Sequence, residues 1–305
     1  MTVTQSFTTF FRTYGTVLAL VVAMLIGALV PQASVLSFLV QYLLMLMLFF
    51  AFLDIKLNPQ SFQKGVVWVL LANLAVAFGV YGAFSLINST LALAAFMTAV
   101  APTAIASPVI ISFIEGHVEY VVASVFLTNI SMALVVPVAL PFLVHTTIPI
   151  STWGILQPVL ITMFVPLILA RITAHLPQAA QSIIRKGKRY SFPLWLFNLF
   201  IVSAKAADFI RSENAVSMHI LLKIALISFI ICVINFTVGA LIGGRQYRQE
   251  ASQALGQKNN SFVIWVALTF LNPLVAMGPT FYVLYHNLYN SFQIYLFFKK
   301  KNKRF

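Results

Sequence analysis

The sequence predicts an all-α integral membrane protein with about ten transmembrane helices in one polytopic membrane domain over residues 1–305. Two observations lead to this fold class. The chain is 61% hydrophobic and only 8% charged, and its mean hydropathy is +0.95, whereas a soluble domain is roughly half apolar. Apolar runs long enough to cross about 30 Å of hydrocarbon also recur along the chain. They are too uniformly apolar for barrel strands, which alternate.

The apolar runs are joined by short connections, so helical hairpins follow one another through the membrane. Only helices or closed barrels satisfy the backbone in lipid, which supports helices for these runs. We place the spans near residues 13–31, 35–53, 66–88, 90–113, 118–144, 152–174, 191–207, 218–243, 251–271 and 273–297.

The 19 lysines and arginines lie mostly beside the apolar runs, on one side of the predicted bundle. That side includes residues 185–189, the arginines at 245 and 248, and the basic tail at residues 299–305, whereas the other side has little beyond Lys205, Arg211 and Lys223. The excess predicts that both termini are cytoplasmic, and we expect the chain to lie in the plasma (inner) membrane. The tail anchors the topology and can bind anionic lipid. This distribution argues against nucleic acid as a partner, despite the net charge of +13.

The fourth span is interrupted. It contains "AVAPTAIASPVI", in which Pro102 and Pro108 bracket five residues in the middle of an apolar run. Proline removes a backbone hydrogen bond and disfavours helical angles in the residue before it. We therefore expect a half-helix, a break near 102–107, and a second half-helix that begins at Pro108 with Ser107 as its N-cap. A simple proline kink is the alternative.

The ninth span contains a polar stretch, "QALGQKNNSF". Gly256 weakens the helix, polar residues follow, and Asn259 or Asn260 can cap a half-helix that runs from Ser261 through Leu271. A polar loop between two shorter elements is the alternative. The apolar residues that follow are too few to span the membrane alone, so we expect the polar cluster at membrane depth.

The two breaks lie about half a chain apart, with five spans in each half. An odd number of spans inverts the second half relative to the first, which gives inverted repeats at about 10–146 and 150–298. Interrupted helices at matching places in inverted halves indicate a secondary transporter whose site lies at the bilayer midplane.

The residues of the breaks favour an anionic substrate. Half-helices that begin at Pro108 and Ser261 present partial positive charge and free N–H groups. Lys258 adds a charge with no carboxylate near it in the sequence. An intramembrane lysine is expected to be functional, here as a fixed counter-charge or a proton carrier. Snorkelling of Lys258 to the cytoplasmic edge is the alternative.

Four stretches carry a family resemblance: "LDIKLNPQSF", "APTAIASPVIISFIEGHVEYVVASV", "ALGQKNNSFVI" and "GPTFYVLYHNLYNS". The second is similar to a Pro-Gly-Gly-Thr-Ala-Ser-Asn motif, and the third to Glu-Val-Gly-Met-Gln-Asn-Ser. Together they resemble the bile acid:sodium symporter family. This resemblance implies ten helices in a panel and a core domain, crossed broken helices four and nine, and sodium-coupled uptake of organic anions.

The chain departs from the family pattern where sodium would bind. The family's glutamate falls at Ala254, its glutamine at Lys258, and its Ser-Asn pair at Ser107-Pro108. Ligands expected in the fifth span fall at two valines, Val121 and Val125. The resemblance therefore implies a divergent member that lacks most sodium ligands. We expect it to carry small organic anions, bile acid or carboxylate-like, by alternating access, with proton-linked or facilitative transport in place of classical sodium coupling.

The candidate site residues are polar groups in or beside the breaks. Asn287 matches a family position near the substrate, His286 is a proton site or a packed histidine, and Asn129 is a ligand or an interhelical hydrogen-bonding residue. The predicted substrate-binding set is Thr103, Ser107, Asn259, Asn260 and Asn287, with Lys258 as ion substitute or proton carrier and Gln257, His286 and Asn129 as secondary candidates.

Two other functions are open. A cation/proton antiporter of related crossed-helix fold usually needs an intramembrane carboxylate, and only the marginal Asp54 is available in the core spans. A polytopic membrane enzyme should show clustered acids and histidines, but the five histidines are scattered. The single cysteine, Cys232, excludes a disulfide framework and a multi-cysteine metal site. We predict no catalytic residues, no metal and no cofactor.

Overall fold

The structure is a computed structural model that describes residues 3–53, 63–144, 152–212 and 218–301. Every named secondary-structure element in these ranges is a helix. Six helical segments among the described residues are long and apolar enough to cross a membrane: Pro31–Phe52, Lys64–Ser85, Val118–Leu143, Thr152–Thr173, Gln178–Ser212 and Met218–Gly243. The chain is an all-helical membrane protein, as its composition predicts.

The described residues of the first half of the chain form six α-helices and one 3₁₀ helix. Prolines begin η1 and follow the start of α5, where a missing N–H costs nothing because the first N–H groups of a helix have no partner. The elements are α1 (Val3–Leu29), η1 (Pro31–Phe38), α2 (Leu39–Phe52), α3 (Lys64–Ser85), α4 (Ser89–Val100), α5 (Ser107–Phe113) and α6 (Val118–Leu143).

In the second half, the part of the chain that the structure describes forms seven α-helices and another 3₁₀ helix. The short amphipathic α8 is largely exposed and carries basic residues in its last turn. The elements are α7 (Thr152–Thr173), α8 (Gln178–Lys186), η3 (Gly187–Tyr190), α9 (Ser191–Ser212), α10 (Met218–Gly243), α11 (Arg248–Gly256), α12 (Asn260–Phe270) and α13 (Pro273–Lys301).

The spans placed from the sequence agree with these helices to within a few residues, with larger differences at the ends. α1 begins at Val3 rather than near residue 13, and α13 continues to Lys301 rather than ending near 297. Both extensions mix polar or basic residues with apolar ones, so an apolar-run criterion omits them although they are helical.

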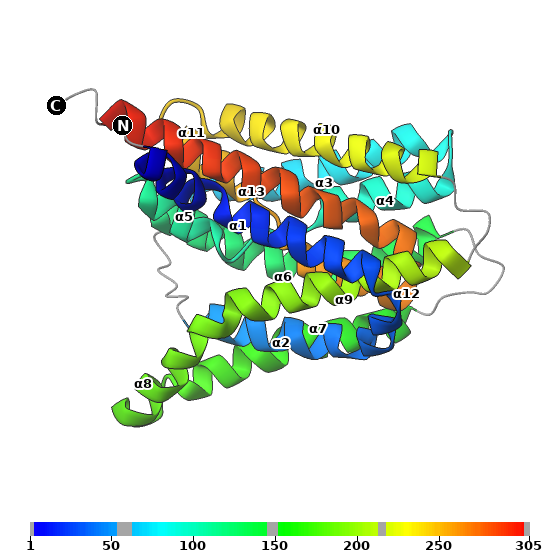
Figure 1. The fold of residues 1–305 in the computed structure, drawn as a ribbon, viewed down its shortest axis with the longest axis horizontal. Helices are drawn as coiled ribbons and strands as arrows, with labels where there is room; N and C mark the ends of the chain where they lie inside the picture. Colours follow the sequence, from blue (N-terminus) through cyan, green and yellow to red (C-terminus); the bar gives the residue numbers. More distant parts are fainter. Residues whose placement is uncertain (1–2, 54–62, 145–151, 213–217, 302–305) are drawn as a thin grey trace.

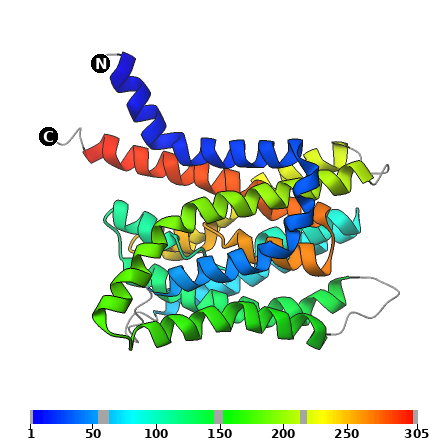
Figure 2. The same ribbon diagram turned by 60° about the horizontal axis from the view of Figure 1, so that its bottom comes forward.

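The helices pack in two groups (Figures 1 and 2). In one group α1 lies along α9, and α2 lies against α7 and α9. In the other, α3 packs on α4, α10 packs on α11 and α13, and the short helices α11 and α12 lie inside. The groups meet where α6 contacts α7, α1 and α9 contact α13, and α2 contacts α12.

One end of the bundle gathers the start of α1, the last turns of α13, α8, and the turn between α10 and α11 (Figure 1). The opposite end holds the connection between α3 and α4. The two broken helix pairs, α4–α5 and α11–α12, meet between these ends, at mid-depth in the bundle.

Candidate functional site

Both predicted breaks are present. α4 ends at Val100 and α5 begins at Ser107, so residues 101–106 leave the helix rather than forming a simple kink. α11 ends at Gly256 and α12 begins at Asn260, and the residues between them are largely buried. The second half-helices each begin one residue earlier than the sequence predicts. Ser107 is therefore the first helical residue, and the N-cap position falls to Ala106, with no side-chain cap bond.

The two breaks cross and pair through their backbones. Asn259 N donates to Pro102 O at 2.7 Å, and Ala104 N donates to Gln257 O at 2.8 Å. These bonds flank an antiparallel bridge between Thr103 and Lys258. Unpaired backbone groups are costly away from water. Each break therefore supplies hydrogen bonds that the other loses by leaving the helix.

Thr103 and Asn129 hold this crossing together. Thr103 N donates to Thr128 Oγ1 at 3.0 Å, and Thr103 Oγ1 donates to Ala254 O at 2.6 Å. Asn129 Nδ2 donates to Thr103 O at 2.9 Å, and Asn129 Oδ1 accepts from Asn259 Nδ2 at 3.3 Å. α6 thereby joins both breaks. These contacts confirm an interhelical hydrogen-bonding role for Asn129.

Lys258 is 2% exposed and extends into the bundle rather than to its edge. Its Nζ donates to Asn73 Oδ1, on α3, and to Ala99 O, in the last turn of α4, at 3.0 Å. Asn73 Nδ2 lies 3.4 Å from Val100 O and 3.3 Å from Ala101 O. The carbonyl end of a helix carries partial negative charge, so Lys258 and Asn73 together cap α4. This geometry contradicts the snorkelling alternative.

The neighbours of Lys258 are neutral. No carboxylate within the described residues forms an ion pair with it. Its backbone N donates to His286 Nδ1 at 3.4 Å, and the Cys232 thiol lies close enough to interact electrostatically. Glu250, in the first turn of α11, instead accepts a hydrogen bond from His117 N at 2.8 Å. The charge at the crossing is therefore not balanced by an acid.

Three predicted site residues keep buried polar atoms without a hydrogen-bond partner among the described residues. They are Ser107 Oγ, Gln257 Oε1, and both side-chain polar atoms of Asn260. All three residues are at most 4% exposed. Buried polar groups are nearly always paired, so these atoms are free to bind water or a polar ligand. Ser107 and Asn260 begin α5 and α12, and Gln257 lies in the second break.

Not every candidate joins the crossing. Asn287 is half-buried on α13, where its Nδ2 donates to Val283 O in its own helix at 2.7 Å. His286 does join it, through Lys258 N. Sequence reasoning missed Asn73, although a polar amide in the middle of the apolar run "VLLANLAV" was a visible signal. Asp54 lies outside the described residues.

A small cavity of about 20 Å³ lies between α6, α2 and α7, at the boundary between the two helix groups. It is lined by Asn129 and Ala133 of α6, Phe52 of α2, and Met163 of α7, among others. The volume is that of about one water molecule. Asn129 therefore contacts both the crossing and the surface that α6 presents to α2 and α7.

No known family model matches the chain, and no curated protein matches it. The family resemblance therefore stays a prediction. Of the four stretches that carry it, "LDIKLNPQSF" lies outside the described residues apart from its leucine. Within the described ranges no cluster of His, Cys, Asp and Glu side chains can hold a metal ion.

Proposed function

We propose that the chain is a secondary transporter of small organic anions, bile acid or carboxylate-like, that works by alternating access without classical sodium coupling. One observation carries the proposal. Lys258 is buried at the crossing of two broken helices, and its Nζ donates to two neutral oxygens of the described residues, Asn73 Oδ1 and Ala99 O. Intramembrane charges mark substrate and ion pathways, and crossed broken helices are a common setting for transporter sites.

The proposed architecture has ten membrane crossings in two inverted repeats, at about 10–146 and 150–298. α1, α2, α7 and α9 form a panel, and α3–α6 and α10–α13 form a core. Two observations support it: one broken helix lies in each half, and the helices pack in two groups. We place the chain in the plasma (inner) membrane with both termini in the cytoplasm. The orientation follows from the basic residues, which gather at the end of the bundle that holds the termini. This arrangement resembles the bile acid:sodium symporters.

In this proposal the ammonium of Lys258 replaces a bound cation at the helix crossing. Its ammonium is attached to the chain and interacts with oxygens at the negative end of α4, where a free cation would need several such ligands. A tethered charge cannot dissociate with the substrate. Transport is then facilitative when Lys258 stays protonated, and proton-linked when Lys258 releases its proton in each cycle.

The unpaired polar atoms near the crossing are the proposed substrate contacts. Asn260 begins the 11-residue α12, whose N-terminal backbone groups favour an anion. Ser107 and Gln257 offer further hydrogen-bonding atoms. α5 has only seven residues, so the anion-binding contribution expected from its start falls mainly to α12 and Lys258.

Flux into proteoliposomes tests the proposal. The purified chain is reconstituted and supplied with radiolabelled bile acids and simple carboxylates, with and without sodium and across a pH gradient. We expect uptake that is independent of sodium and lost in Lys258→Gln. The matched control is Lys223→Gln, which removes an exposed lysine of α10 and should transport normally.

Two outcomes would contradict the proposal. Unchanged uptake in Lys258→Gln would remove the role of Lys258, and stimulation of the parent chain by sodium would remove the sodium-independent mechanism. A response of uptake to the pH gradient separates proton-linked from facilitative transport. His286 and Cys232 are the other titratable groups beside Lys258, so His286→Gln and Cys232→Ala are measured in parallel to assign that response.

A further inference from the structure

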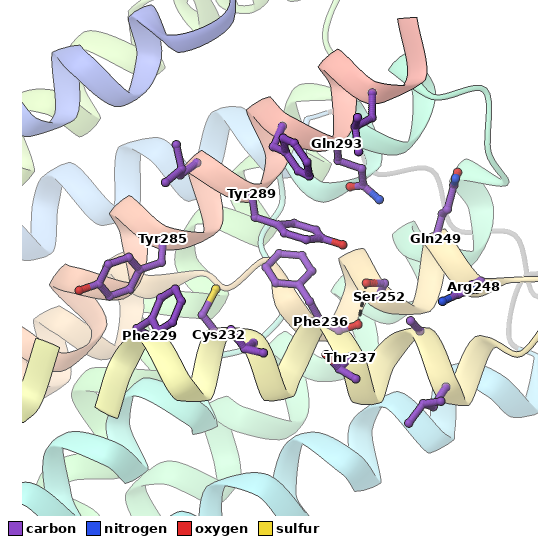
Figure 3. Close-up of a pocket in the computed structure, with 16 residues that line it drawn as sticks. Phe229, Cys232, Phe236, Thr237, Arg248, Gln249, Ser252, Tyr285, Tyr289 and Gln293 are labelled. Atoms are coloured by element: carbon purple, nitrogen blue, oxygen red, sulfur yellow. Dashed lines mark hydrogen bonds between the residues drawn. The ribbon is translucent and has the colours of Figure 1, made fainter. Parts of the chain in front are cut away.

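A groove separate from the helix crossing runs along α10, α11 and α13 (Figure 3). Its volume is about 940 Å³, near the upper end of ordinary ligand pockets. None of the candidate site residues lines it. Several residues of its wall are exposed on the outside of the bundle, among them Leu241, at 74%, and Val233, at 50%. In a membrane these residues face the lipid.

Aromatic rings form the wall of the groove. Phe229 and Tyr285 close one end, with ring centroids 5.5 Å apart, and Phe236 lies against Tyr289 in the middle at 4.0 Å. Ser252 Oγ donates to Phe236 O at 2.8 Å (Figure 3). That bond fixes α10 to α11. A preformed apolar surface of this kind suits a hydrocarbon chain.

The other end of the groove is polar and basic. Arg248, Gln249 and Gln293 gather there in Figure 3. Arg248 is exposed, and no described residue forms an ion pair or hydrogen bond with its guanidinium. Glu250, on the same helix, is buried against His117 instead, and no acidic side chain lines the groove.

The length of the groove matches one leaflet of a bilayer. Its lining follows α10 from Phe229 to Leu241, which is about 18 Å at the rise of a helix. Half of the hydrocarbon core is about 15 Å. The basic end therefore lies near the headgroups of the leaflet on the side of the α10–α11 turn, and the Phe229–Tyr285 end lies near the midplane.

We propose that this groove binds one anionic phospholipid, whose phosphate interacts with Arg248 and whose acyl chain lies against the aromatic wall. The guanidinium of Arg248 pairs with the lipid phosphate, and it favours a headgroup with a net negative charge, because the quaternary ammonium of a zwitterionic headgroup offsets the attraction of its phosphate for the arginine. A zwitterionic lipid has the same acyl chains and fills the groove without that charge preference. This inference does not rest on the proposed transport function.

Native mass spectrometry of the purified full chain tests the site. Phosphatidylglycerol and phosphatidylcholine with identical acyl chains are the probes. We expect the parent chain to prefer phosphatidylglycerol by about fivefold, the effect of one basic side chain near a membrane surface. Arg248→Gln should remove that preference. Lys186→Gln, which removes an exposed basic residue of α8 at the same end of the bundle, should keep it.

A second pair of variants tests the acyl-chain position. Thr237→Trp places an indole in the groove, and we expect it to reduce retention of both lipids (Figure 3). Leu226→Trp adds the same bulk at an exposed site on α10 that does not line the groove, and it should retain both. Equal binding of the two lipids by the parent chain would overturn the proposal. The proposal would also be overturned if the two variants of either pair bound lipid equally. A dimer that excludes lipid would overturn it too, because a second copy of the chain would then cover the groove.

Discussion

At the scale of single residues, Asn73 and Lys258 depend on each other. Asn73 Oδ1 accepts from Lys258 Nζ, while Asn73 Nδ2 faces the carbonyls of Val100 and Ala101. The amide oxygen therefore faces the ammonium, and the amide nitrogen faces the carbonyl end of α4. A buried charge without its partner is strongly destabilising, whereas removal of both partners is far milder. Loss of the amide should harm the fold mainly because Lys258 remains.

Asn73→Leu should therefore reduce the free energy of unfolding by about 3–5 kcal/mol, and Asn73→Leu combined with Lys258→Met should cost less than Asn73→Leu alone. Thermal unfolding of the four proteins of this double-mutant cycle in the same detergent measures the coupling. Additive effects would show that the contact between Asn73 and Lys258 carries no energy.

At the scale of elements, the end of α11 is set by close packing. A Cβ atom at Gly256 would overlap the ring of Phe236 on α10. Tyr282 Oη, from α13, donates to Gly256 O at 2.7 Å and so binds a carbonyl that the helix leaves unpaired. The break in the ninth span therefore depends on two neighbouring helices as well as on its own polar residues.

Gly256→Ala should lower stability by about 1–3 kcal/mol, because Phe236 must move away from the new methyl group. Gly82→Ala is the control, since a Cβ atom there meets nothing within 4 Å. In the exposed last turns of α3 it should leave stability unchanged or raise it by about 0.5–1 kcal/mol. Melting temperatures in detergent compare the two, and equal melting temperatures would mean that α11 tolerates the displacement.

The sequence predicts the existence and position of both breaks because their causes are local. Pro102 and Pro108 cannot continue α4, and Gly256 precedes a polar run. The predicted helix caps were wrong, because contacts with neighbouring helices determine them. Ser107 does not act as an N-cap. Asn259 does occupy the N-cap position of α12, but its side chain donates to Asn129 instead of capping the helix.

The partners of the site residues were beyond prediction for a related reason. Lys258 stood out as an intramembrane charge, but its contacts come from α3 and α4, far away in the chain. A hydropathy pattern predicts how deep in the membrane a residue lies and on which side of its helix. It does not predict which other helix the residue contacts. The contacts of Asn73 and the groove along α10 and α13 arise only from helix packing, so the sequence shows an amide in an apolar run but neither its partners nor the groove.

At the scale of the whole molecule, the charge distribution makes a test of topology possible. The chain has one cysteine, Cys232, so a Cys232→Ala background permits single new thiols. Ser182→Cys lies on the exposed face of α8, and Ile87→Cys lies between α3 and α4, at 70% exposure. With the basic end cytoplasmic, a membrane-impermeant maleimide should label Ile87→Cys in intact cells. It should reach Ser182→Cys only after permeabilisation, and the reverse pattern would invert the proposed topology.

Alternating access requires the two helix groups to move relative to each other, which gives a prediction for the boundary between them. Ala133 of α6 and Met163 of α7 line the same small cavity at that boundary. In the Cys232→Ala background, Ala133→Cys with Met163→Cys should form an oxidative cross-link that stops flux in proteoliposomes, and a reducing agent should restore it. Such a bond ties α6 of the proposed core to α7 of the proposed panel.

A cross-link within the panel is the matched comparison. Gln41 Nε2 on α2 donates to Thr162 Oγ1 on α7 at 2.9 Å, so Gln41→Cys with Thr162→Cys joins two helices that move together. Oxidation of this pair should leave flux unchanged. Continued flux through an oxidised Ala133–Met163 pair would contradict movement at this boundary, and arrest by both pairs would place the moving surface between α2 and α7. Only a difference between the two pairs assigns the motion to the surface between α6 and α7, where Asn129 lines the small cavity.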